Sequence, residues 1–99
     1  MEVSFADDSL ERLETEAIYT AGLAPGLVRA FRLRMQAIRA AVDERDLRVM
    51  KSHHFEKLSG SRQHQHSMRL NDQFRLILEI QGAGPDKVIR VIGIEDYHR

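Results

Sequence analysis

Two segments in the first half of the chain carry hydrophobic residues at every third or fourth position, which is the spacing of an amphipathic helix. In the first segment these residues are Leu10, Leu13 and Ala17. An aspartate before them, Asp7 or Asp8, can cap the N-terminus of a helix through its carboxylate, so we expect a helix over residues 8–18. The short apolar stretch at residues 2–5 predicts an edge strand.

The second segment has the stronger helical pattern, because its apolar residues fall within one sector about 100° wide around the helix axis. They are Leu27, Val28, Phe31, Met35, Ile38 and Val42. The pattern predicts a helix over residues 26–42, with Arg29, Arg32, Gln36 and Arg39 beside the apolar sector. These polar residues form either a stripe that faces RNA or an ordinary solvated face, and the solvated face is the simpler interpretation.

From Phe55 onward the apolar residues alternate with polar residues, which is the period of β-strands rather than of helices. This alternation predicts strands near residues 53–58, 65–70, 74–81 and 87–95. The charged segment before them, residues 43–52, has room for a short turn of helix. The last strand is apolar on both faces, which is typical of a strand with a neighbour on each side.

Two helices followed by a meander of strands predict an α+β fold in which both helices pack on one face of the sheet. A chain of 99 residues is long enough for one such core and too short for two. We therefore expect residues 1–99 to form a single domain.

The apolar pattern also sets the register of one hairpin. A loop of residues 71–73 gathers the apolar residues of its two strands on one face, and a shift of one residue would scatter them. These residues are Met68, Leu70, Phe74, Leu76 and Leu78. The same register places Arg69 opposite Arg75 on the other face. Two guanidinium groups suit a phosphate, whereas the alternative is that each arginine pairs with a carboxylate such as Asp72 or Glu79.

The composition excludes several classes of protein and indicates where positive charge gathers. Fifteen basic and fifteen acidic residues cancel, yet bases outnumber acids by eleven to five between positions 29 and 75, so a positive field is expected there. The absence of cysteine excludes a disulfide scaffold and thiolate catalysis. No apolar run approaches the roughly 18–20 residues of a membrane span, and the first residues do not resemble a signal peptide. We expect a cytoplasmic protein with no membrane partner.

The histidines are the remaining candidates for chemistry. His64 and His66 share a face of a predicted strand, but no cysteine and no cluster of carboxylates completes a metal site, so we expect no metal and no cofactor. His98 follows Asp96 and Tyr97 and can exchange a proton at neutral pH. By its spacing alone, an exposed histidine in the chain's tail is the simpler interpretation.

The segment His66–Leu78 together with Ile94–His98 resembles the HigB branch of the RelE/ParE toxin superfamily. The match is close over residues 55–99, and the two preceding helices are compatible with it. The resemblance implies a RelE/ParE-like α+β fold with two N-terminal helices on a curved, mainly antiparallel sheet. It also implies a toxin of a type II toxin–antitoxin pair, whose partner is usually a helix-turn-helix antitoxin of the HigA type.

The resemblance carries specific residues with it. It implies catalytic roles for Arg69, Arg75, Asp96, Tyr97 and His98. The candidates for substrate binding are Lys57, Arg62 and Asn71. In the motif leucine–lysine–glycine, the usual lysine is replaced here by Ser59, and Lys57 or Arg62 could supply the missing cation. Arg99 extends the chain one residue past the usual terminal histidine.

Members of the HigB branch cleave mRNA in the ribosomal A site, so the resemblance favours a ribosome-dependent endoribonuclease (an mRNA interferase) with ribosome and mRNA as partners. Cleavage without a metal uses the 2′-hydroxyl of the RNA as nucleophile and needs a base, an acid and cations. Two alternatives stay open. One is a ParE-like toxin that inhibits DNA gyrase and has no nuclease activity. The other is a decayed homologue that only binds its partner. The replacement of the usual lysine by Ser59 is the sequence feature that most favours this alternative.

Overall fold

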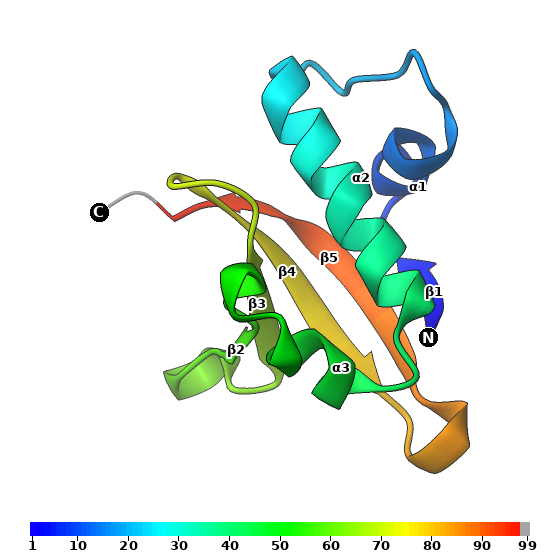
Figure 1. Cartoon of the computed structure of the whole chain (residues 1–99), viewed down its shortest axis with the longest axis vertical. Coiled ribbons are helices and arrows are strands. Elements are labelled where there is room, and N and C mark those ends of the chain that lie inside the picture. Colours follow the sequence, from blue (N-terminus) through cyan, green and yellow to red (C-terminus); the bar gives the residue numbers. More distant parts are fainter. Residues whose placement is uncertain (98–99) are drawn as a thin grey trace.

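A mixed sheet of five strands forms the centre of the structure. The computed structural model describes residues 1–97, and within them the strand order is β1-β5-β4-β3-β2 (Figure 1). The strands are β1 (Glu2–Phe5), β2 (Glu56–Lys57), β3 (Gln65–Arg69), β4 (Phe74–Gln81) and β5 (Val88–Asp96). β1 runs parallel to β5 and the other neighbours are antiparallel, so the prediction of a mainly antiparallel sheet is confirmed.

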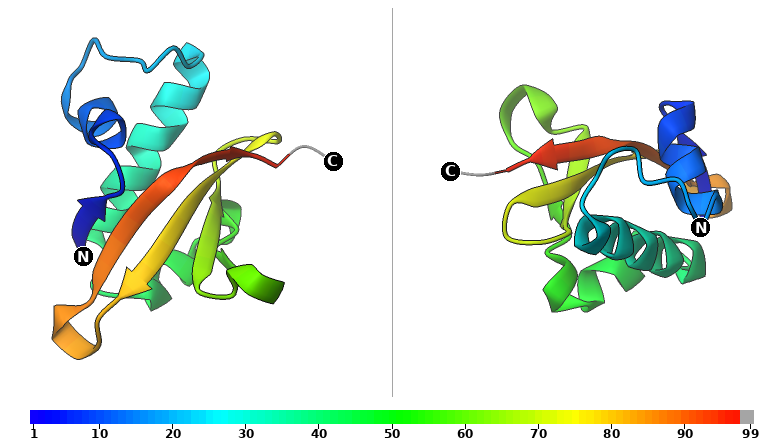
Figure 2. Two further views of the ribbon diagram at one scale, coloured as in Figure 1. Left: turned by 180° about the vertical axis from the view of Figure 1, so that it is seen from behind. Right: turned by 90° about the horizontal axis from the view of Figure 1, so that it is seen from above.

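Three α-helices accompany the sheet in the part of the chain that the structure describes, and the third lies in the segment 43–52, where the sequence left room for a short turn of helix. They are α1 (Asp8–Thr15), α2 (Pro25–Ala40) and α3 (Glu44–Val49). Asp7 caps α1, because its carboxylate accepts a hydrogen bond from the amide of Leu10 at 3.0 Å. Figures 1 and 2 show α2 and α3 against one face of the sheet, with α1 beside α2 near β1.

The core lies between α2 and the sheet, as the sequence predicts. Its fully buried side chains include Phe31, Met35 and Ile38 from α2 and Met68, Leu76, Leu78, Ile89 and Val91 from the strands. Val42 is an error of the prediction, because α2 ends at Ala40 and the backbone of Ala41 is extended. The side chain of Val42 is therefore 85% exposed.

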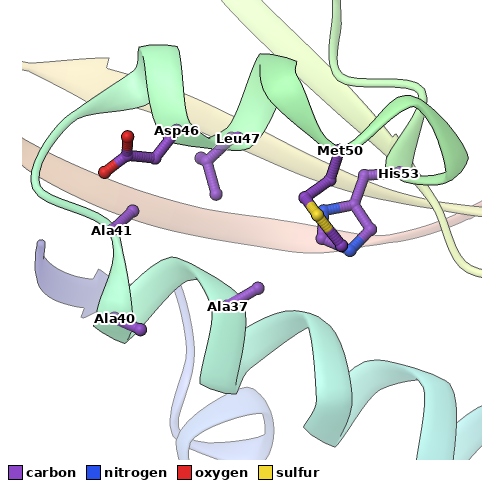
Figure 3. A pocket seen from close by; sticks show the side chains of 7 residues that line it. All are labelled: Ala37, Ala40, Ala41, Asp46, Leu47, Met50 and His53. Atoms are coloured by element: carbon purple, nitrogen blue, oxygen red, sulfur yellow. The ribbon is translucent and has the colours of Figure 1, made fainter.

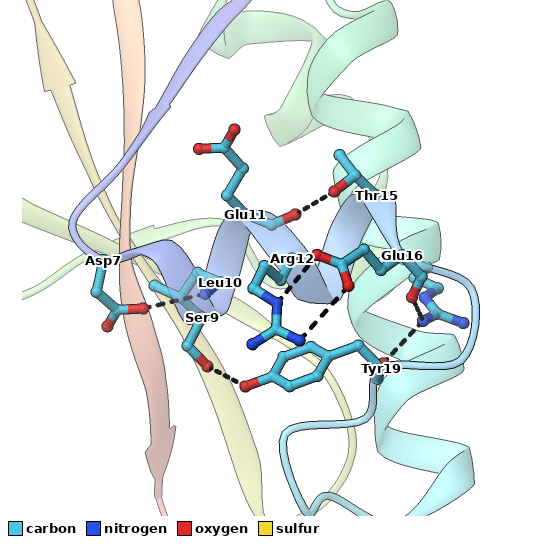
Figure 4. A network of polar contacts seen from close by, with 9 residues as sticks. Asp7, Ser9, Leu10, Glu11, Arg12, Thr15, Glu16 and Tyr19 are labelled. Carbon is cyan, nitrogen blue, oxygen red and sulfur yellow. Dashed lines mark hydrogen bonds and ion pairs between the residues drawn. The ribbon is translucent and has the colours of Figure 1, made fainter.

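Arg32 and Arg39 of α2 hold α1, so the arginines of α2 do not form one stripe toward RNA. Arg32 donates to the backbone carbonyls of Leu13, Glu16 and Tyr19 at 3.0–3.1 Å, which satisfies acceptors at the C-terminal end of α1. Figure 4 shows the polar contacts along α1, from its N-terminal cap at Asp7 to Glu16 and Tyr19. Arg39 reaches the same helix and pairs with Glu14 at 2.7 Å. Two arginines of the predicted stripe thus form contacts within the protein that hold α1 in place.

Two histidines are buried among these elements. His53 is 6% exposed and His66 is 9% exposed, and neither Nδ1 has a hydrogen-bond partner within the described part of the chain. Burial lowers the pKa of His53, and the charge of Arg34 lowers it further. Burial also lowers the pKa of His66, with a further contribution from Arg48. Both imidazoles therefore favour the neutral form in the folded protein.

This burial predicts a loss of stability in mild acid. The ordinary pKa is 6.5, and both folded-state values lie below it, so the unfolded chain takes up protons first as the pH falls through 6.5. We expect the thermal unfolding midpoint to fall between about pH 6.5 and pH 5, before most carboxylates titrate. The doubly substituted variant His53→Leu, His66→Leu should show a flatter profile over this range. An equally steep profile in that variant would assign the acid sensitivity to other groups.

A pocket of about 380 Å³ opens between α2 and α3 (Figure 3). Its lining is mostly apolar and consists of Ala37, Ala40, Ala41, Asp46, Leu47, Met50 and His53. None of the residues singled out for catalysis or substrate binding lines it. No helix in residues 1–97 is long and apolar enough to cross a membrane.

Candidate functional site

The hairpin of β3 and β4 has the predicted register, and it presents two arginines on the face of the sheet away from α2. Met68 pairs with Leu76 and Arg69 pairs with Arg75. Successive residues of a strand point to opposite faces, so burial of Met68 and Leu76 against α2 places both arginines on the other face. We call this the open face, because α2 and α3 lie behind the sheet when it is viewed from this side (Figure 2, left).

Arg69 and Arg75 form one row with Glu95 across three strands. Arg69 lies opposite Arg75, and Arg75 lies opposite Glu95 of β5. Arg69 forms a salt bridge with Asp72 of the hairpin loop, so for this arginine the carboxylate alternative holds. Arg75 has no carboxylate within 4.0 Å among residues 1–97. Its guanidinium lies instead over the ring of Tyr97, 5.2 Å from the ring centroid.

The hairpin loop is shaped by its own side chains. The amide oxygen of Asn71 accepts hydrogen bonds from the backbone amides of Gln73 at 2.9 Å and Phe74 at 2.7 Å. Such a bond pattern stabilises a tight turn. The structure therefore gives Asn71 a role in the loop that places Arg75 at the start of β4, and its contact with substrate stays a prediction.

Gln73 joins the loop to the last strand, a role that the sequence analysis missed. Its backbone carbonyl accepts from the amide of Tyr97 at 2.6 Å, and its side-chain amide donates to Asp96 at 3.0 Å. These bonds bring Asp96 and Tyr97 to the end of the hairpin that carries Arg75. The only signal in the sequence was the position of Gln73 in the loop of residues 71–73, within the segment that resembles the HigB branch. His98 lies outside the described residues.

Arg34 supports the hairpin from the opposite side of the sheet. Its Nε donates to the backbone carbonyl of Arg69 at 2.8 Å, which ties α2 to the end of β3. Burial and the nearby charge of Arg69 lower the pKa of Arg34. The sequence held a signal for this contact, because Arg34 lies three residues after Phe31 and four before Ile38, on the side of α2 that faces the core.

Arg62 also reaches the open face. It lies in a short 3₁₀ turn, Gly60–Arg62, and binds both carboxylate oxygens of Glu95, with Nη1 to Oε1 at 2.9 Å. Its Nε donates to the side-chain oxygen of Gln65 on β3 at 3.0 Å. Because β4 lies between β3 and β5, the guanidinium of Arg62 crosses above β4. Arg62 lowers the pKa of Glu95 through this hydrogen-bonded pair.

The fold does not place Lys57 on the open face with Arg69 and Arg75. It pairs with His66, which stacks on Phe55 on the helix side of the sheet, and paired residues share a face. Strand β2 ends at Lys57, so it does not extend to Ser59, the position of the missing lysine. Of the two basic residues expected to replace the missing lysine, only Arg62 lies beside the row of Arg69, Arg75 and Glu95.

The described residues of the site carry three guanidinium groups, one aromatic ring and nearby carboxylates. Guanidinium groups at these positions can bind a phosphate and stabilise extra negative charge on it. No three of the histidine, aspartate and glutamate side chains in residues 1–97 are grouped so that they could hold a metal ion.

Comparisons with known proteins identify the family and the fold. A family model described as "RelE-like toxin of type II toxin-antitoxin system HigB" matches residues 3–93. Among solved structures, the YoeB/ParE toxin from Agrobacterium tumefaciens has a TM-score of 0.58, with 18% sequence identity over 99% of this chain and 100% of that chain. This likeness confirms the expected RelE/ParE-like α+β fold. No curated protein matches the sequence.

Proposed function

The chain belongs to the HigB family of RelE-like toxins of type II toxin–antitoxin systems, and from this premise we propose that it is a ribosome-dependent endoribonuclease. A toxin of this type has a cognate antitoxin, which we propose to be a helix-turn-helix protein of the HigA type. The proposed substrate is mRNA in the ribosomal A site, and the proposed location is the cytoplasm, where translation takes place.

One observation carries this proposal. Arg75 lies on the open face between Arg69 and Tyr97, with no carboxylate within ion-pair distance in residues 1–97. A guanidinium in this state keeps its charge and its donors for an anionic ligand. The backbone phosphate of RNA is the anion that a toxin of this family would meet at such a place.

The chemistry follows from what RNA itself provides. The 2′-hydroxyl attacks the neighbouring phosphorus, the bond to the 5′-oxygen breaks, and the products are a 2′,3′-cyclic phosphate and a 5′-hydroxyl. Arg69 and Arg75 stabilise the extra negative charge that develops on the phosphate oxygens. A base removes the proton of the 2′-hydroxyl and an acid protonates the 5′-oxygen. We assign His98 to one of these proton transfers, with Asp96 and Tyr97 positioning it or adjusting its pKa.

Dependence on the ribosome has a physical reason in this scheme. Cleavage needs the 2′-oxygen, the phosphorus and the 5′-oxygen in line, and a flexible mRNA rarely adopts that geometry alone. Orientation of the reacting groups can contribute about 7–11 kcal/mol in the best cases. The ribosome would supply the orientation, and exposed basic residues of α2, such as Arg29, would contribute to docking on ribosomal RNA.

The test is a map of mRNA 5′ ends in a reconstituted translation reaction, with and without ribosomes. We expect cuts at codons in frame and only when ribosomes are present. A second mRNA carries a 2′-deoxynucleotide immediately before the cut, which removes the nucleophile and should abolish that cut alone. The absence of cuts with ribosomes would overturn the proposal, and inhibition of DNA gyrase by the same preparation would then favour the ParE-like alternative.

A further inference from the structure

Glu95 is the feature of the site that calls for an explanation. Glu95 lies directly opposite Arg75 in the strand register. The two side chains therefore leave the backbone on the same face of the sheet, at neighbouring positions. Directly opposed side chains in an antiparallel pair are close enough for an ion pair. A carboxylate bound to Arg75 would compete with any phosphate for the same guanidinium. In the structure this ion pair does not form among the described residues, because Glu95 is bound elsewhere.

Arg62 is the group that binds Glu95. The contact uses both terminal nitrogens of the guanidinium and both oxygens of the carboxylate, a bidentate geometry that fixes the direction of the carboxylate. The third nitrogen of the guanidinium group, Nε, donates to the side-chain oxygen of Gln65 at 3.0 Å. Gln65 is itself held through its amide nitrogen, which donates to Glu79 at 3.2 Å. A chain of hydrogen bonds thus aims Arg62 at Glu95 from the β3 side.

We propose that Arg62 is a positioning residue that neutralises Glu95 and holds its carboxylate away from Arg75, so that Arg75 stays available for the phosphate of the substrate. This inference rests on the proposed function, because it assigns Arg62 a part in binding the scissile phosphate. It differs from the expectation of a substrate-binding Arg62. In that expectation Arg62 touches the phosphate itself and Glu95 has no part.

The two roles differ in how Arg62 depends on Glu95. If Arg62 acts through Glu95, then Arg62→Ala releases a carboxylate that binds Arg75, and removal of the same carboxylate by Glu95→Gln cancels the damage. If Arg62 binds phosphate directly, Arg62→Ala is equally harmful with and without Glu95. The double variant Arg62→Ala, Glu95→Gln therefore decides between the two roles, as a double-mutant cycle.

The first measurement is kcat/KM for cleavage of mRNA on programmed ribosomes. We expect Arg62→Ala to lose about tenfold, the effect of one added ion pair at a partly exposed site. Glu95→Gln should keep at least the wild-type value, and the double variant should lie within about threefold of Glu95→Gln. Arg62→Lys should recover most of the loss, because it keeps the charge. A double variant as inactive as Arg62→Ala would overturn the proposal.

The second measurement needs no ribosome, so it separates failure of this inference from failure of the proposed function. Inorganic phosphate is titrated into the isolated protein, and the Nε–H signal of the Arg75 side chain is followed by NMR. Arg62→Ala should bind phosphate about tenfold more weakly than wild type, with recovery in the double variant. An Arg75 signal that does not respond to phosphate in the wild type, or responds equally in all variants, would overturn the inference.

Discussion

Replacing Arg75 with alanine should lower kcat/KM for mRNA cleavage by about 100- to 1,000-fold, the usual effect of removing one preorganised donor to a developing charge. Arg75 is held at the start of β4 by the turn that Asn71 forms and lies over the ring of Tyr97 at 5.2 Å. Its side chain makes no ion pair within residues 1–97, so little folding energy depends on it. The thermal unfolding midpoint should therefore change little while the activity falls.

The matched control is Arg45→Ala. Arg45 lies in α3, its side chain is 85% exposed, and its ion pair with Asp43 is remote from the hairpin. Arg45→Ala removes one positive charge, as Arg75→Ala does. A loss of activity caused only by the change in net charge would therefore appear in both variants. The kcat/KM of Arg75→Lys should stay well below that of wild type, because an ammonium group lacks the planar pair of donors of a guanidinium group. Full cleavage by a folded Arg75→Ala variant would contradict the assignment of Arg75 to the phosphate.

Replacing His98 with alanine should lower the rate of the cleavage step by about 100- to 10,000-fold, the range for loss of a general acid or base. The reason begins at Tyr97, whose amide is bound to Gln73 at 2.6 Å and whose ring lies under Arg75. His98 is the next residue in the chain. The measurement is single-turnover cleavage on ribosomes saturated with toxin, which reports the chemical step rather than binding.

The control for His98→Ala is His54→Asn. His54 is exposed and has a left-handed backbone with φ of 45°, a conformation that asparagine tolerates better than alanine. Cleavage by His54→Asn should equal that of wild type across the pH range. If His98→Ala cleaves as fast as wild type, the function would stand and the proton transfers would belong to other groups, with Tyr97→Phe as the next variant.

The sequence predicted best what depends on a repeating pattern. The alternation of apolar residues from Met68 to Leu78 is compatible with one register only, and that register places Arg69 opposite Arg75. The apolar sector of α2 likewise identified its buried face. In both cases the physical cause is local, because one side of a strand or helix must be removed from water.

The sequence predicted less well the partners of charged side chains. Arg62 pairs with a residue 33 positions away, and Arg34 with one 35 positions away. Such contacts depend on where strands and helices end, which hydrophobic periodicity does not determine. Lys57 shows the same point, since its pairing with His66, which periodicity does not determine, places it on the helix side of the sheet.

The parallel pairing of β1 with β5 has a consequence for the time at which the site can exist. Glu2 pairs with Val88 and Phe5 with Val91, so β1 finds its partner only after β5 has been synthesised. At about 5–20 residues per second, this delay lasts several seconds. Contacts between such distant segments also slow folding itself. Since β5 carries Glu95 and leads into Tyr97, a newly made chain stays without its assembled site throughout this interval, during which an antitoxin already present in the cell can meet it.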